Sequence, residues 1–464
     1  MKKQAVLKKN DVITLKIEDI TNLGFGVGKF NGAVVFVSGA VTGDVAEVKI
    51  IKSASSYYIG RIEKIIELSD IRGKDRCENT KCRSCAYKCI KYEEELKIKE
   101  NIVRSAFLKE GLSDISVLPT VPSPKTYEYR NKAQYPIAKD KNGEYIIGFY
   151  APKTHTVCEA ADCPISPKIF SEILELLRSF FKKHKISVYD ETSGSGLLRH
   201  VYLRRGEISE EITVTIVING DNLPHSDELV TILTANFEKI CGILLNVNKE
   251  DTNVILGDEY KTLFGRDYII DTLAGANLKI TVPSFYQVNH GTATLIYKEA
   301  RHLASIKSSD TLLDLYCGAG SIGLSMAEDA GELIGIEIID AAVECARYNA
   351  KLCGIKNARF YTGDAKNTES LLANAEKEMG KKIAPDVVVL DPPRAGCDEK
   401  LIDYVASLTP KRIVYISCNP TTLARDVKRF KALNYTTTEV KPFDMFPMTG
   451  HVESVVSLTR GFDN

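Results

Sequence analysis

The sequence contains no apolar run that approaches the roughly 20 residues needed to cross a lipid bilayer. Its first ten residues are basic, and they lack the apolar core that a secretion signal requires. We therefore expect a cytoplasmic protein that makes no membrane contact. The 61 Lys and Arg residues equal the 61 Asp and Glu residues in number, so the formal net charge is zero and gives no overall attraction to polyanions. The sequence also lacks internal repeats and low-complexity tracts.

The 464 residues are enough for about three domains with a large buried core. Residues 1–67 alternate apolar and polar positions in short runs, such as Val12–Ile17 and Ala33–Val37, which is typical of a small β-barrel. Glycines between residues 24 and 28 fit tight turns, and they also fit a close approach of the backbone to a phosphate. Residues 1–66 hold ten Lys or Arg against six Asp or Glu, a positive excess that is compatible with nucleic acid.

Residues 68–284 show an α+β pattern that begins with a cysteine cluster and a charged helix predicted over 92–109. From 285 to 464, apolar strands alternate with amphipathic helices. Continuous Val, Ile and Leu strands between helices imply a doubly wound α/β sheet of the Rossmann type, covered on both faces. The strands predicted in this region are 311–315, 333–338, 358–362, 386–390, 412–417 and 454–460.

A glycine-rich turn follows the first of these strands, in the order Asp314-x-x-x-Gly318-x-Gly320. Sites for nicotinamide, flavin and adenosylmethionine all use such turns, and a purely structural turn gives the same pattern. The spacing differs from the GxGxxG of dinucleotide sites. The turn therefore indicates a nucleotide-like cofactor without identifying it.

Acidic residues at three successive strand ends narrow the choice of cofactor. Glu337 closes the second strand, where a carboxylate accepts hydrogen bonds from both hydroxyls of a ribose. Asp364 follows the third strand, where it meets an adenine edge, and Asp391 follows the fourth. Carboxylates at these places suit a cofactor with ribose and adenine but no phosphates, so we favour S-adenosyl-L-methionine over a dinucleotide.

Cys418 ends the apolar strand 412–417, just before a turn and a helix. Carbon 5 of uracil is too weak a nucleophile to take a sulfonium methyl group unaided. A thiolate that adds to carbon 6 makes carbon 5 reactive, and a base must later remove the carbon 5 proton so that the thiol can leave. The loop before the last strand offers His451 and Glu453 as bases. A free cysteine after a strand is more often structural, but beside this cofactor pattern we interpret Cys418 as a nucleophile.

These motifs resemble those of the RNA (uracil-5-)-methyltransferase family over nearly the whole chain. The sequences DPPRAG (391–396), SCNP (417–420) and HVE (451–453) match, in order, three signatures of its catalytic domain. The sequence SFYQVN (284–289) resembles its cofactor and substrate entry motif, and residues 1–66 resemble its barrel, the TRAM domain.

The resemblance implies specific roles for individual side chains. By that resemblance Cys418 is the nucleophile, Glu453 is the base and His451 supports them. The residues that the resemblance implies for adenosylmethionine contact are Gln287, Tyr316, Glu337 and Asp391. The domains that it implies are a TRAM barrel over 1–67, a central α+β domain over 68–284 and a class I methyltransferase domain over 285–464.

Two other kinds of base methylation fit the sequence less well. Enzymes that methylate amino groups of adenine or guanine need no cysteine, and they favour an aromatic residue where this chain has Arg394. Cytosine-5 enzymes usually carry a cysteine directly after a proline of the fourth-strand motif, which this chain does not provide. Cys397 lies four residues beyond Pro393 and is expected to be structural.

Twelve cysteines in a chain expected to be cytoplasmic indicate metal binding or catalysis rather than disulfides. Thiolates spaced as in this cluster hold zinc or an iron–sulfur cluster, and a site without metal remains an alternative. The clustered positions are Cys77, Cys82, Cys85 and Cys89, with Cys158 and Cys163 farther along. The resemblance implies a structural 4Fe-4S cluster on Cys77, Cys82, Cys85 and Cys163. The first gap is one residue shorter than usual, which together with Cys89 and Cys158 leaves the fourth ligand open.

Two segments, 129–135 and 198–205, interleave cationic and aromatic side chains that suit phosphates and unstacked bases. The same interleaving also occurs on the solvated face of a sheet. With the resemblance, RNA is the expected partner and a monomer the expected state. The barrel and the cysteines favour 23S rRNA by analogy, with tRNA, or a non-catalytic RNA-binding or ribosome assembly factor, as alternatives. The target uracil must be turned out of its stack, so a structured RNA loop is the expected substrate.

Overall fold

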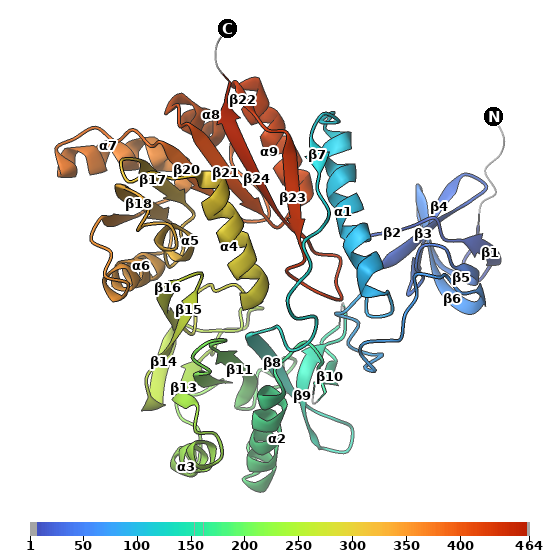
Figure 1. Ribbon diagram of the computed structural model, residues 1–464. Coiled ribbons are helices and arrows are strands. Elements are labelled where there is room, and N and C mark those ends of the chain that lie inside the picture. Colours follow the sequence, from blue (N-terminus) through green and yellow to red (C-terminus); the bar gives the residue numbers. More distant parts are fainter. Residues whose placement is uncertain (1–6, 153, 161, 462–464) are drawn as a thin grey trace.

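The computed structural model describes residues 7–152, 154–160 and 162–461. Figure 1 shows a small strand-rich unit at the N-terminal end, a central sheet with helices against it and a C-terminal sheet between helices. Among the described helices, none combines the length and the apolar character that a membrane span requires.

The N-terminal unit is one curled sheet of six strands in the order β1-β5-β6-β4-β3-β2. Alternate side chains, including Val35, Val37 and Val48, point into a single apolar core, as the alternating sequence predicts. The strands are β1 (Val12–Lys16), β2 (Asp19–Ile20), β3 (Phe25–Phe30), β4 (Ala33–Ser38), β5 (Val45–Ser53) and β6 (Tyr57–Glu67).

A glycine turn brings this barrel against residues 77–89, called the cysteine segment below. Gly24 has φ +76°, and a Cβ atom on it would lie 2.4 Å from Cβ of Ala86. The Tyr87 hydroxyl donates a hydrogen bond of 2.9 Å to the carbonyl of Thr21 in the same turn. At Gly24, therefore, the missing side chain allows contact with protein, as expected of a tight turn.

The central sheet has seven strands in the order β10-β9-β8-β11-β12-β13-β14. Helix α2 (Lys168–Lys183) buries Phe170, Leu177 and Phe181 against it, and α3 (Ser226–Asn236) adds Leu229 to the same core. The strands are β8 (Lys132–Lys139), β9 (Tyr145–Tyr150), β10 (Val157–Glu159), β11 (Leu198–Arg205), β12 (Ile212–Ile218), β13 (Ile240–Val247) and β14 (Glu259–Gly265).

The C-terminal sheet follows the order β19-β18-β17-β20-β21-β24-β23-β7. Strands β19 to β21 are parallel, and β24 joins them antiparallel, which confirms the doubly wound fold expected from the sequence. The strands are β17 (Thr311–Leu315), β18 (Glu332–Glu337), β19 (Ala358–Thr362), β20 (Val387–Leu390), β21 (Arg412–Ser417), β22 (Tyr435–Thr436), β23 (Glu439–Phe443) and β24 (Glu453–Arg460).

Helices cover both faces of this sheet because successive residues of a buried strand point to opposite sides. Leu312 belongs to the core under α4, α6 and the β15–β16 hairpin, and Leu313 to the core under α7, α8 and α9. The elements are α4 (His290–Ala304), α5 (Ser321–Leu324), α6 (Asp340–Leu352), α7 (Thr368–Met379), α8 (Glu399–Ser407), α9 (Pro420–Ala432), η1 (Ala365–Asn367), β15 (Tyr268–Leu273) and β16 (Ala276–Thr281).

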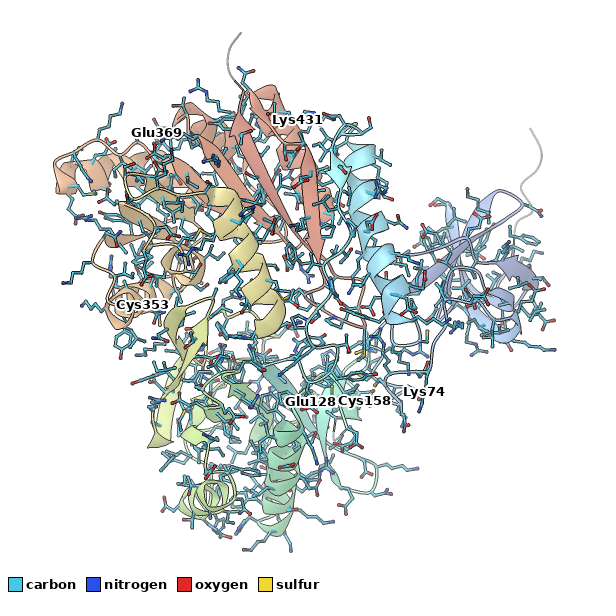
Figure 2. The ribbon with its side chains drawn as sticks, in the orientation of Figure 1. Lys74, Glu128, Cys158, Cys353, Glu369 and Lys431 are labelled. Atoms are coloured by element: carbon cyan, nitrogen blue, oxygen red, sulfur yellow. The ribbon has the colours of Figure 1, made fainter. Side chains whose placement is uncertain are left out.

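Helix α1 (Tyr92–Lys109) and strand β7 (Ser116–Val117) extend this C-terminal unit. β7 pairs in parallel with β23, and Phe107 of α1 is buried in the core that contains Phe430 of α9. Lys431, labelled in Figure 2, forms an ion pair of 2.5 Å with Asp114 between α1 and β7. The division proposed from composition places these two elements in the central region, whereas their apolar faces pack with the C-terminal sheet.

A fully buried ion network joins α1 to the loop that leads into β24. The Lys99 ammonium donates hydrogen bonds of 2.8 Å to Oε1 of Glu95, 2.5 Å to Oδ1 of Asp444 and 3.1 Å to the carbonyl of Phe446. The Glu95 carboxylate also accepts the backbone N–H of Met448 at 2.7 Å. Charges buried this deeply are stable only when they are paired, so the network fixes the loop to the helix.

The barrel, the cysteine segment and the central unit also contact this loop. The Tyr129 hydroxyl donates to the carbonyl of Pro447 at 3.1 Å, and the Tyr87 N–H donates to the carbonyl of Met448 at 2.9 Å. A Cβ on Gly450 would lie 2.2 Å from the carbonyl oxygen of Asn22 in the barrel. Barrel, cysteine segment and central sheet thus converge on the residues just before Glu453.

We expect Lys99→Met to lower the free energy of unfolding by about 3–5 kcal/mol, because it leaves the buried Glu95 and Asp444 carboxylates without their shared cation. Lys97→Met is the matched control on the same helix, since its pair with Glu94 is exposed and contributes about 0–1 kcal/mol. Denaturant unfolding of both variants measures the difference. Equal losses in the two variants would contradict a role for the buried network.

Candidate active site

The carboxyl ends of neighbouring strands bring the predicted site residues to one edge of the C-terminal sheet. Tyr316 follows β17, Glu337 ends β18, Asp391 follows β20 and Cys418 follows β21. These four strands are adjacent and parallel, so their ends meet at the same edge. Four residues far apart in the sequence therefore share one site.

The pairing of β21 with β24 brings the thiol near the carboxylate. Ser417 pairs with Ser454 in antiparallel register, Cys418 directly follows Ser417, and Glu453 directly precedes Ser454. The charge of Glu453 acts on the Cys418 thiol, so the two groups lie close together. Cys418 is partly exposed and Glu453 is buried. The arrangement leaves the thiol open to a substrate and keeps the carboxylate behind it away from water.

Burial and mutual charge raise the pKa of each group in this site. Burial raises the pKa of Cys418 to about 11, with the carboxylates of Glu453 and Asp391 adding to the effect and Arg394 opposing it. Burial also raises the pKa of Glu453 to about 8, again with Asp391 adding and Arg394 opposing. Asp391 keeps some solvent contact but lies deep in the molecule, and burial raises its pKa to about 7.

The turn after β21 is built so that it connects the thiol to the Asp391–Arg394 loop. Asn419 caps α9 by accepting the N–H of Thr421 at 3.1 Å, and Pro420 suits the first helical position. The Asn419 amide also donates to the carbonyl of Arg394 at 2.9 Å. Arg394 is thereby held beside Cys418, where its charge offsets that of the two carboxylates.

The glycine-rich turn presents backbone and carboxylates together. Glu337 accepts the N–H of Gly318 at 3.1 Å through Oε2 and the N–H of Ile339 at 3.0 Å through Oε1. Tyr316, with φ +64°, and Gly318, with φ +54°, both have left-handed backbone. Such a turn brings backbone groups close to a bound cofactor.

Asp314 is a buried carboxyl on β17, just before this turn, and no role was predicted for it. Its Oδ2 accepts the N–H of Gly323 at 2.9 Å, and its Oδ1 has no hydrogen-bond partner among the described residues. Burial raises its pKa to about 8. Its position in the Asp314-x-x-x-Gly318 motif was the available signal, but only the fold shows that one oxygen remains unsatisfied.

The segment 284–289 lies at the junction of the central and C-terminal units. The amide of Asn131 donates to the carbonyl of Gln287 at 2.9 Å, and the Asn131 N–H donates to the carbonyl of Val288. Gln287 is partly exposed, whereas Phe285 is 72% exposed. Asn131, directly before strand β8, thus orients this segment.

The structure also shows the surroundings of three further candidate residues, His451, Cys397 and Asp364. Burial, Arg394 and Lys99 lower the pKa of His451, which favours a neutral ring. Cys397 is buried, its N–H donates to Asp426 at 2.8 Å, and burial raises its pKa to about 12, as suits a structural thiol. Asp364 caps the short helix η1 by accepting the N–H of Lys366.

A cavity of about 640 Å³ lies beside the cysteine segment. Cys89 and Cys158 lie outside its lining: Cys89 accepts a hydrogen bond from Arg72, and Cys158, labelled in Figure 2, is buried on β10. The four cysteines that line the cavity are Cys77, Cys82, Cys85 and Cys163.

The spacing of these sulfur atoms bears on the kind of metal centre. Tetrahedral zinc with bonds of about 2.3 Å holds its sulfur ligands about 3.8 Å apart. Within the described part of the chain, no three of the cysteine sulfurs lie within 4.8 Å of one another. The cysteine sulfurs are therefore farther apart than the ligands of one zinc ion, and their spacing suits a larger inorganic cluster.

His184, His225 and Glu228 also come within 4.8 Å of one another. The two imidazole rings stack with centroids 4.0 Å apart and planes inclined by 26°, so their lone pairs do not converge on one point. Glu228 is already paired with Lys183 at 2.6 Å. This cluster is therefore an aromatic and ionic contact between α2 and α3.

Known proteins resemble this chain over nearly its whole length. The chain is 39% identical over 464 residues to an uncharacterized RNA methyltransferase of Clostridium acetobutylicum, with 99% of each chain covered. It is 37% identical over 460 residues to one of Clostridium tetani, with 99% of this chain and 98% of the relative covered. A Pyrococcus abyssi tRNA (uracil-54, C5)-methyltransferase, solved with S-adenosyl-L-homocysteine, superposes with a TM-score of 0.77 at 27% identity, covering 96% of this chain and 100% of that one.

Two family profiles match this chain. The TRAM domain profile matches residues 7–62, and the tRNA (uracil-5-)-methyltransferase profile matches residues 91–461. The second match includes every predicted catalytic and cofactor residue, together with the strands that position them. The chain belongs to the tRNA (uracil-5-)-methyltransferase family and is an RNA methyltransferase with an N-terminal TRAM domain.

Proposed function

We propose that this protein methylates carbon 5 of a uridine in RNA through a covalent bond to Cys418. The observation that carries the proposal is the β21–β24 pairing, which brings a partly exposed thiol near a buried carboxylate with a pKa of about 8. A nucleophile and a base on opposite sides of one small space are what this reaction needs. A non-catalytic RNA-binding factor would not need to retain this arrangement.

In the proposed reaction the Cys418 thiolate adds to carbon 6 of the uracil, which makes carbon 5 nucleophilic. S-adenosyl-L-methionine, when bound, supplies the methyl group. Glu453 then accepts the proton from carbon 5, and the carbon–sulfur bond breaks to restore the thiolate. The positive charge of Arg394 stabilises negative charge beside Cys418. It therefore lowers the pKa of both the thiol and Glu453.

We propose that this edge of the sheet binds adenosylmethionine. The proposed contacts combine the left-handed turn, which exposes backbone, with carboxyl groups that accept ribose hydroxyls. The residues that would hold the cofactor are Gln287, Tyr316, Glu337 and Asp391.

We propose large-subunit rRNA as the substrate, since the barrel and the cysteine cluster together resemble that branch of the family. The similarity to the Pyrococcus abyssi tRNA enzyme supports tRNA as the second candidate. Incubating the protein with each RNA and locating 5-methyluridine by mass spectrometry decides between them. Methylation of an amino group in either RNA would contradict the proposal.

We expect Cys418→Ala to abolish methyl transfer, because no adduct can then form. Glu453→Gln should still form the adduct but release it at least about 100-fold more slowly, since the proton acceptor is lost. Labelled methyl incorporation and denaturing gels of the protein–RNA adduct measure the two steps. Cys353→Ala, at the far end of α6, is the control thiol and should behave like the parent protein. Full activity of Cys418→Ala would refute the mechanism.

The raised pKa values predict that activity increases with pH. Glu453 must be ionised to accept a proton, so the release step should rise through a pKa of about 8 and then level off. The thiolate fraction of Cys418, with a pKa of about 11, increases over the same range. Single-turnover rates measured from about pH 6.5 to about pH 9 test this. A rate that falls over this interval would contradict Glu453 as base.

We also propose that Cys77, Cys82, Cys85 and Cys163 hold a 4Fe-4S cluster that stabilises the segment around them. Their shared cavity and wide sulfur spacing support it, and the methyl transfer itself requires no electrons.

Protein purified without oxygen should contain about four irons per chain, as a 4Fe-4S cluster requires. Cys163→Ser should lose most of them, whereas Cys158→Ser should retain them because Cys158 lies outside the cavity. Elemental analysis measures iron and zinc together. Stoichiometric zinc, or iron lost only in Cys158→Ser, would overturn the assignment.

A further inference from the structure

Two cationic side chains lie directly opposite each other on neighbouring strands of the central sheet. Lys132 of β8 pairs with Arg204 of β11 in antiparallel register. Like charges in such a pair repel each other and destabilise the sheet. The fold therefore retains an arrangement that its own stability does not favour.

No carboxylate neutralises these charges among the residues that the structure describes. Lys132, Arg204 and the nearby Arg130 form no ion pair within 4.0 Å among the described residues, whereas the buried Lys99 is paired with two carboxylates. Burial, Arg204 and Arg130 together lower the pKa of Lys132 to about 8. The three cations thus form a local excess of positive charge, although Arg130 also lines the cysteine cavity and acts on Cys85 there.

Arg204 is held rigidly and still has an unused donor. It is 1% exposed, and its Nη2 donates to the Tyr202 hydroxyl at 2.6 Å and to the carbonyl of Ser284 at 2.7 Å. Its Nη1 is buried and has no hydrogen-bond partner in the described structure. The fixed charge of this guanidinium adds to that of Lys132, its partly exposed cross-strand neighbour, where an anion has access.

These cations border the segment 284–289, which is part of the proposed cofactor and substrate site. Arg204 binds the carbonyl of Ser284, and Arg130 forms a β-bridge with Asn289. Between Arg130 and Lys132, Asn131 binds the carbonyl of Gln287. An anion held at Lys132 would therefore lie next to the exposed Phe285 and the entrance to the site.

We propose that Lys132, backed by Arg204 and Arg130, binds one phosphodiester group of the RNA substrate beside the target uridine. The inference rests on the proposed function, because it assumes that RNA approaches this edge. The adenosylmethionine carboxylate is the other anion that could meet these cations, and its binding is separated from RNA binding in the test below.

The experiment measures the affinity of the full chain for a fluorescein-labelled RNA stem-loop with a uridine in the loop, as a function of sodium chloride. Lys132→Met should weaken binding about three- to sixfold at about 0.1 M salt and reduce the slope of log K against log salt by about 0.7–0.9, as loss of one phosphate contact predicts. The affinity for adenosylmethionine should not change. Lys139→Met, at the exposed end of the same strand, is the matched control and should leave the slope as it was.

Three results would overturn the inference. The slope could remain unchanged in Lys132→Met, it could fall equally in Lys139→Met, or the variant could lose adenosylmethionine affinity instead, which would assign the cations to the cofactor carboxylate. The outcome is independent of the methylation chemistry. A reduced slope without any 5-methyluridine product would support the phosphate site and contradict the proposed function. An unchanged slope with 5-methyluridine product would contradict only the phosphate site.

Discussion

The ammonium group of Lys99 ties the helix that follows the cysteine segment to the loop that leads into the last strand. Glu95, Asp444 and the carbonyl of Phe446 surround it, and no solvent reaches its side chain. Burying these charges costs several kcal/mol per ion, and their close pairing offsets that cost only while the geometry is kept. The loop can therefore hardly move without breaking the network.

This rigidity matters for Glu453, which begins β24 five residues after Met448. The Met448 N–H binds Glu95, its carbonyl accepts from Tyr87, and its side chain packs with Cys85, Tyr129 and Ile165. The cysteine segment, helix α1 and the loop before Glu453 are consequently one connected structure. A metal cluster in the cysteine cavity would stabilise this loop indirectly, without taking part in the proposed reaction.

Sequence patterns predicted the part of the protein that depends on local periodicity. The strands 311–315, 358–362 and 412–417 occur at the predicted bounds, because short apolar or aromatic runs between helices leave few alternatives. Contacts between segments that are distant in the sequence have no periodic pattern, so they could not be predicted. Lys99 and Asp444 are 345 residues apart, and the opposition of Lys132 and Arg204 depends on a strand register that no short motif encodes. The pairing of Lys99 with Glu95 four residues earlier was the one local sign, and it is common on exposed helices.

The central claim is that the sulfur of Cys418 bonds to carbon 6 of the target uracil. The most direct measurement uses RNA in which that uridine is replaced by 5-fluorouridine, whose carbon 5 fluorine cannot be removed as a proton. After incubation with adenosylmethionine, digestion and peptide mass spectrometry locate the bond. The account predicts a methylated fluorouridine adduct on the peptide that contains Cys418. An adduct on Cys397 or another cysteine, or methylated RNA without any adduct, would contradict it.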